Sequence, residues 1–156
     1  MTLNPDLVRE RCQEITDSLA RLERFQEVPR DEFLEDQDSL DIACYRLLVA
    51  IEAALGLCFH VSAKRLETVP ADYAACFGNL GDAGLIPEDL SSRLQRMARF
   101  RNLLVHVYWE VDYERVRDVI DNHLDDLRQF RSAMAGLLPP SNGTGRGNER
   151  GSQGGE

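Results

Sequence analysis

One segment of the chain gathers most of the side chains that could do chemistry. Residues 99–109 read Arg-Phe-Arg-Asn-Leu-Leu-Val-His-Val-Tyr-Trp, and they hold Arg101, Asn102, His106 and Tyr108. A histidine titrates near neutral pH, so His106 could take a proton from a ribose 2′-hydroxyl or give one to a leaving 5′-oxygen. An arginine stays protonated and cannot be the base, but its planar fork suits a phosphate in the transition state. With Asn102 orienting the imidazole or binding a phosphate oxygen, the set is suited to metal-independent cleavage of RNA.

The spacing of this segment limits how one chain could use it. The pattern around it is helical, and an α-helix turns about 100° per residue, so Arg101 and His106 would point roughly 140° apart. One chain could bring both side chains to a single phosphate only if the helix ended before His106. Alternatively, two chains could pack these helices together and pool their residues. We favour a symmetric dimer, because an isologous contact brings two copies of the segment to one cleft.

Three more arginines precede the segment on the same predicted helix. Arg93, Arg96 and Arg99 form a local basic patch in a chain of formal net charge −9. That acidity argues against broad, non-specific binding of nucleic acid, which relies on a basic face. The net charge does not exclude a small, local basic cleft. The three arginines are therefore candidate RNA contacts, and a solvated helix face is the alternative interpretation.

The elements that must position this segment are predicted to be helices throughout. Helix starts are indicated at Pro5 (after a capping Asn), Asp38, Pro70, Pro87 and Asp112, each followed by apolar residues at helical spacing. The stretch that begins at Asp38 is the most apolar and is expected to be the central, buried helix. No convincing strand pattern of period two is present. The predicted fold class is all-α, an up-and-down bundle of four to five helices, dimeric.

Composition divides the chain into two parts. Residues 1–138 are predicted to form one helical domain, since 43% of the chain is hydrophobic. Residues 139–156 are rich in Gly, Ser and Asn and hold no apolar residue, so a disordered tail is expected there. The polar N-terminus lacks the apolar run of a signal peptide, and no run of about 18 apolar residues occurs. We therefore expect a cytoplasmic location and no membrane span.

The cysteines do not suggest a metal centre. Cys12, Cys44, Cys58 and Cys76 are far apart in the sequence and form no C-x-x-C pair. Each lies among apolar residues, so we expect all four to be small core residues, with no disulfide framework. No carboxylate cluster or Cys/His pair offers an alternative catalytic set. Neither a metal nor a cofactor is predicted.

The string R-N-x-L-V-H-x-Y at residues 101–108 resembles the R-x4-6-H signature of the HEPN superfamily, and more narrowly the R-x4-H-x-Y form of the HepT toxins. Other segments extend the likeness over about residues 5–135. The apolar stretch 47–60 resembles the second helix of the family, 70–86 its middle segment and 126–130 its last helix. One departure is Gly56, which stands where relatives often carry an acidic residue.

The resemblance implies a function, partners and a modification. HepT toxins are helical homodimers whose paired R-x4-H motifs form a metal-independent ribonuclease site at the interface, which here assigns catalysis to Arg101, Asn102 and His106. An MNT-type nucleotidyltransferase antitoxin neutralises them by adding AMP to the motif tyrosine, here Tyr108. A bulky, charged AMP beside His106 would block entry of RNA. The alternative hypothesis is a non-catalytic HEPN module that binds a partner nucleotidyltransferase or a nucleotide.

Overall fold

The computed structural model describes residues 2–106 and 111–140, which form seven α-helices and no strand. The helices in chain order are α1 (Pro5–Gln26), α2 (Arg30–Glu35), α3 (Gln37–Arg65), α4 (Tyr73–Asp82), α5 (Glu88–His106), α6 (Tyr113–Asn122) and α7 (Leu124–Ala135). The predicted all-α fold class is thus confirmed.

Short polar side chains start the helices, as the sequence pattern indicates. The Asn4 side chain accepts hydrogen bonds from two backbone N–H groups of the first turn of α1, at 3.1 and 3.3 Å, and Pro5 takes the first helical position. Asp36 caps α3 and Asp72 caps α4 in the same way. Because Asp72 supplies the cap, α4 begins at Tyr73, three residues after the predicted start at Pro70.

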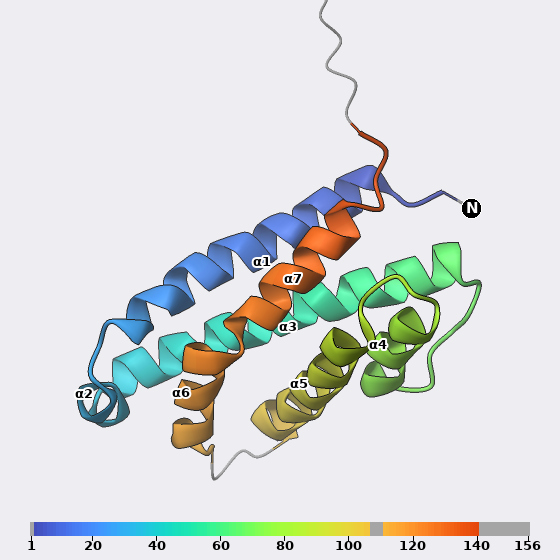
Figure 1. The fold of residues 1–156 in the computed structure, drawn as a ribbon. Helices are drawn as coiled ribbons and strands as arrows, with labels where there is room; N and C mark the ends of the chain where they lie inside the picture. The colour runs from blue at the N-terminus through green and yellow to red at the C-terminus, as the bar shows by residue number, and fades with distance from the viewer. Residues whose placement is uncertain (1, 107–110, 141–156) are drawn as a thin grey trace, which may run out of the picture.

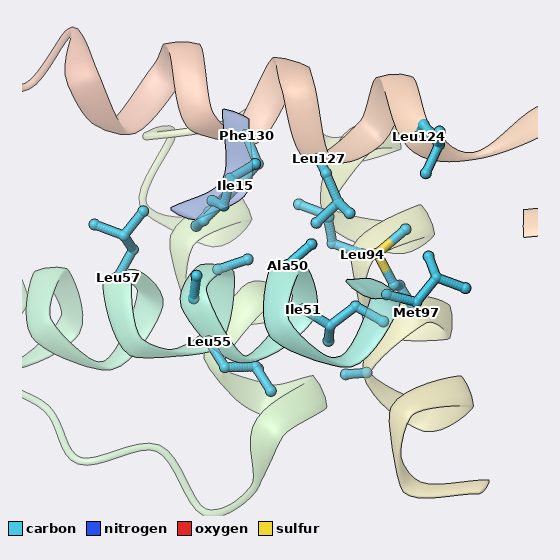
Figure 2. Packing of buried hydrophobic residues seen from close by; sticks show 14 of the residues in the cluster. Ile15, Ala50, Ile51, Leu55, Leu57, Leu94, Met97, Leu124, Leu127 and Phe130 are labelled. Carbon is cyan, nitrogen blue, oxygen red and sulfur yellow. The ribbon is translucent and has the colours of Figure 1, made fainter. Parts of the chain in front are cut away.

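The bundle is built around α3. The two long helices α1 and α3 pack side by side, and α7 lies against both (Figure 1). Helices α4 and α5 pack together on another side of α3. Apolar side chains from these helices meet in one continuous core (Figure 2). Its largest fully buried members are Phe33, Phe77, Phe130, Ile15, Leu22, Leu47, Ile51, Leu57, Leu80, Leu90, Leu94 and Ile120. The core fixes the place of α3, α4 and α5, the three helices that carry the candidate site.

Two features raise the helix number above the predicted four to five. The short acidic segment after Pro29 forms α2, whose Phe33 is fully buried and lies 5.4 Å from the ring of Phe25. The predicted last helix is broken at His123, where the backbone is not helical (φ −125°, ψ 1°). The break was not predicted because the apolar spacing continues across it and neither Gly nor Pro marks it.

Helices α4 and α5 meet closely through a glycine. A Cβ at Gly81 would lie only 2.6 Å from the side chain of Ser91, so any larger residue would push the two helices apart. Ser91 is buried and donates a hydrogen bond of 2.9 Å to the carbonyl of Phe77. The turn between the helices uses Gly84 at φ +75°, a backbone conformation that glycine adopts without strain. This joint holds α5 in a fixed place against α4.

A disulfide crosses from α3 to α4. Cys58 and Cys76 are both fully buried, are 18 residues apart in sequence, and are bonded, with Cα atoms 6.1 Å apart. The expectation of four unpaired cysteines is therefore wrong for this pair. The turn of the chain between α3 and α4 brings the two together, and sequence spacing alone does not reveal it. Cys12 and Cys44 are free and half-buried, and burial raises the pKa of the Cys44 thiol to about 11.

Helix α3 is long and apolar enough to cross a membrane by length and composition alone. Half of its most apolar 18-residue window is buried inside the bundle, where Ala50 and Ile51 contribute to the core. Its role as the central helix accounts for this apolar composition.

Candidate functional site

The residues at the chemistry-bearing end of α5 border an open groove of about 820 Å³. Three elements form its walls: the later half of α3, the link into α4 with the first turn of that helix, and the last two turns of α5. The lining residues are Phe59, Pro70, Ala71, Asp72, Tyr73, Ala74, Arg99, Arg101, Asn102 and Val105. Two of the three predicted catalytic residues, Arg101 and Asn102, thus lie in one groove.

The guanidinium of Arg101 is held from two sides. Its Nε donates to Glu52 of α3, and its Cζ lies 4.8 Å from the ring centroid of Tyr73 of α4. Tyr73 is itself fixed by Phe59, whose ring meets it edge-on at 5.8 Å. Only 14% of the Arg101 side chain is exposed. Because its long side chain is ordered before any ligand arrives, binding a phosphate there would cost less conformational entropy.

This arrangement leaves hydrogen-bond donors for a ligand. An arginine carries five N–H donors. Among the described residues, Arg101 uses one on Glu52 and one on the Oδ1 atom of Asn102, at 3.4 Å. The remaining donors and the amide NH₂ of the exposed Asn102 border the groove. The groove therefore offers a fixed positive charge and several N–H groups, which is what an oxyanion or a phosphate requires.

The structure describes His106 and Tyr108 less completely than Arg101 and Asn102. His106 is the last residue of α5, so the helix continues through it and does not end before it. The turn from Arg101 to His106 therefore stays that of an α-helix, roughly 140°. Tyr108 lies outside the described residues. The catalytic role of His106 and the modification of Tyr108 remain predictions.

The three upstream arginines have different surroundings. Arg93 is paired with Asp126 at 2.8 Å and with Asp89 at 3.1 Å, and these bonds raise its pKa. Arg99 is exposed and lines the groove beside Asn102. Arg96 is exposed on another side of α5 and lines a separate cleft. The structure thus divides the predicted basic patch between an ion pair, the groove and a second cleft.

Two residues of the site were missed by the sequence reasoning. Glu52 is the only acidic residue between positions 42 and 66, and this lone carboxylate in the most apolar stretch was the available signal. Glu52 lies on α3 one helical turn before Gly56, and its carboxylate accepts a hydrogen bond from Arg101. A Cβ at Gly56 would instead lie 3.4 Å from Nε of Arg11, toward α1. Tyr73 gave no such signal, since an aromatic on a helix is ordinarily a packing residue.

His60 has a structural role in this chain. Its Nε2 accepts a hydrogen bond of 3.0 Å from the backbone N–H of Asn4, which links α3 to the residue that caps α1. Accepting this bond requires an unprotonated Nε2. Partial burial, together with the charge of Lys64, lowers the pKa of His60 and favours that form.

The chain is similar in sequence to the proteins of one known family. Residues 15–134 match the family described as Ribonuclease HepT-like. The mRNA nuclease HepT of Shewanella oneidensis is 30% identical over 111 residues, which is 70% of this chain and 84% of that protein.

Solved structures share the fold. The tri-AMPylated HEPN toxin of Shewanella oneidensis in complex with its MNT antitoxin has a TM-score of 0.77 and 24% identity, over 84% of this chain and 98% of that one. A second structure, a toxin–antitoxin complex with AMP-PNP, has a TM-score of 0.73 and 26% identity, over 83% of this chain and 98% of that one.

Proposed function

Because the chain belongs to the Ribonuclease HepT-like family, we propose that it is a metal-independent endoribonuclease that acts as the toxin of a HepT/MNT toxin–antitoxin pair. The observation that carries the proposal is the guanidinium of Arg101, fixed by Glu52 and Tyr73 at the groove that also holds Asn102. A structural helix end would not need an arginine ordered in this way with donors left over.

The chemistry uses the residues of the motif. His106 takes the proton from the ribose 2′-hydroxyl as the 2′-oxygen bonds to the phosphorus, or gives one to the 5′-oxygen as the bond from phosphorus to that oxygen breaks, which leaves a 2′,3′-cyclic phosphate and a free 5′-hydroxyl. Arg101 stabilises the charge that develops on the phosphate oxygens, and it does so best where water is partly excluded. Asn102 donates its amide to a phosphate oxygen or to the imidazole. Arg99, on the exposed side of the groove, attracts the strand.

The active form is proposed to be a homodimer. Since α5 is helical through His106, positions 101 and 106 lie roughly 140° apart around the helix axis, and we therefore expect the site to need a second copy. Ile42 and Tyr45 of α3 are 49% and 60% exposed and lie on the same face of that helix as Glu52, the partner of Arg101. An isologous contact through this apolar face would bring two motif helices to one cleft.

The proposed partner is an MNT-type nucleotidyltransferase, and its target is the hydroxyl of Tyr108. In that reaction the tyrosine oxygen bonds to the α-phosphorus of ATP, the bond from that phosphorus to the β-phosphate bridge breaks, and pyrophosphate leaves. The added phosphodiester is negatively charged, so it would repel RNA from the neighbouring motif. The setting for both reactions is proposed to be the cytoplasm.

The decisive experiment compares growth and total RNA after inducing wild type, Arg101→Ala and His106→Ala. We expect growth arrest and new RNA fragments with the wild type and with neither of these two variants. Arg101→Ala loses the group that binds the phosphate, and His106→Ala loses the group that transfers the proton. Arg21→Gln, on an exposed face of α1, removes a charge elsewhere and should behave as wild type. Intact RNA and normal growth with all four proteins would refute the nuclease and leave the non-catalytic binding module as the function.

A separate experiment tests the dimer. Tyr45→Asp places a charge in the proposed contact and should shift the mass measured by light scattering from two chains to one, with loss of RNA cleavage. If Tyr45→Asp leaves a dimer that still cleaves RNA, this face of α3 is not the interface.

A further inference from the structure

A second cleft lies on the other side of α5, where that helix passes the break between α6 and α7. Its volume is about 160 Å³. Its lining consists of Arg93, Arg96 and Met97 of α5, Arg115 and Asp118 of α6, His123 at the break, and Asp126 of α7. Three guanidinium groups thus face two carboxylates and one imidazole in a chain that is acidic as a whole.

Each carboxylate of this cleft accepts one hydrogen bond from a neighbouring side chain. Asp126 accepts a hydrogen bond of 2.8 Å from Nε of Arg93, and its other oxygen lies 3.5 Å from Nδ1 of His123. Asp118 accepts from the side chain of Asn122 at 2.7 Å, and its second oxygen lies 3.8 Å from Nε2 of His123. Arg93 is therefore committed to Asp89 and Asp126, and one oxygen of each cleft carboxylate accepts a hydrogen bond, whereas the second oxygen of Asp126 is buried without a hydrogen-bond partner in the described part of the chain.

Arg96 and Arg115 are the two cations that remain. Neither forms an ion pair with any carboxylate in the described part of the chain, and both are exposed. The guanidinium of Arg115 lies 5.5 Å from the ring centroid of Phe100, which orients it from one side. Two guanidinium groups from different helices thus border one small cleft, and their planar N–H forks suit a tetrahedral oxyanion.

We propose that this cleft binds one backbone phosphate of the RNA strand whose cleavage takes place at the Arg101 groove. The inference rests on the proposed ribonuclease function and extends it to a second subsite. The cleft holds about five waters at roughly 30 Å³ each. That space is large enough for a phosphate group.

The surface of α5 connects the two places. Arg96, Arg99 and Asn102 follow one another at intervals of three residues, so their Cβ atoms are neighbours about 5–6 Å apart along the helix surface. All three are exposed, and the last two line the groove of Arg101. A strand leaving the groove would therefore pass Arg99 and Arg96 along α5 and reach Arg115 of α6 at the second cleft.

The test measures binding of a short fluorescent 2′-O-methyl RNA to the full chain at several salt concentrations. This probe has no 2′-hydroxyl, so binding is read without cleavage. The double variant Arg96→Gln/Arg115→Gln is compared with Arg21→Gln/Arg24→Gln, which removes the same charge from exposed positions of α1. Equal melting temperatures of the two variants exclude a folding effect.

We expect the cleft variant to bind about tenfold more weakly than the control. Its plot of log affinity against log salt should be shallower by about 0.7, the value for one phosphate contact on a single strand. Arg115→Lys, which keeps the charge, should recover part of the affinity. Equal affinity and slope in the cleft variant and the control would overturn the subsite and leave the nuclease standing.

Two further outcomes separate the proposals. If the wild type cleaves no RNA but the cleft variant still shows the weaker, shallower binding, the nuclease fails and the phosphate site is supported. If AMP binds the wild type and not the cleft variant, while both bind the RNA probe equally, the cleft serves a free nucleotide and the proposed strand contact is wrong.

Discussion

Replacing Tyr73 with leucine tests whether the ring positions the arginine of the site. The Arg101 guanidinium lies 4.8 Å from the ring centroid, and such contacts contribute roughly 0.5–1 kcal/mol at exposed positions and about 2 kcal/mol when desolvated. Only 14% of the Arg101 side chain is exposed, so a value of about 1.5 kcal/mol is expected. If this energy holds the guanidinium where the transition state needs it, Tyr73→Leu lowers kcat/KM for RNA cleavage about tenfold.

The assay is cleavage of a fluorogenic RNA, with two controls. Tyr73→Phe keeps the ring and should cleave nearly as well as wild type, because the hydroxyl makes no hydrogen bond within the described structure. The second control repeats Tyr73→Leu in an Arg101→Ala background, where no further loss is expected if the ring acts through the arginine. A further tenfold loss in that background would refute the reasoning, since the ring would then act on RNA directly.

The remaining predictions concern the frame of the site. Replacing Cys58 and Cys76 by alanine removes a cross-link that closes a loop of 18 residues and should lower the free energy of unfolding, measured with urea, by about 3 kcal/mol. An unchanged free energy of unfolding in the double variant would contradict this. The lowered pKa of His60 means that the unfolded chain binds the proton first, so this residue stabilises the fold above pH 6.5 and loses that effect as the pH falls. The melting temperature should therefore fall more steeply between pH 7 and 5 in wild type than in His60→Gln, and parallel curves would show that protonation of His60 does not affect stability. Gly81→Ala places a Cβ 2.6 Å from the side chain of Ser91 in α5 and should lower the free energy of unfolding by about 1–3 kcal/mol. An unchanged urea midpoint would show that α4 and α5 can move apart at this contact at no cost.

The distribution of charge shows where an acidic chain could attract the RNA that we propose as its substrate. The net charge of −9 disfavours phosphate at long range, and salt at physiological strength screens such charges beyond about 8 Å. Close to α5, a phosphate would meet the exposed guanidinium groups of Arg96, Arg99 and Arg115, which border the groove and the second cleft. Binding should therefore depend on a few close contacts, which favours selectivity over affinity for nucleic acid in general.

Local sequence determined most of the fold. The cap at Asn4, the start after Pro87 and the apolar spacing of α3 each depend on residues within a few positions of one another, and such patterns are visible in the chain itself. The motif from Arg101 to His106 was visible for the same reason. The break at His123 was not, because nothing in its immediate sequence interrupts the helical pattern.

The sequence alone therefore determined the helical class, the basic stretch of α5 and the residue types that could cleave RNA. Only the tertiary structure decided that Glu52 and Tyr73 hold Arg101, that Cys58 and Cys76 are bonded, and that Arg115 meets Arg96 at a second cleft. The physical reason is distance along the chain. Helix formation depends on neighbours three or four residues apart, whereas these contacts join residues of different helices that only the packing of the core brings together.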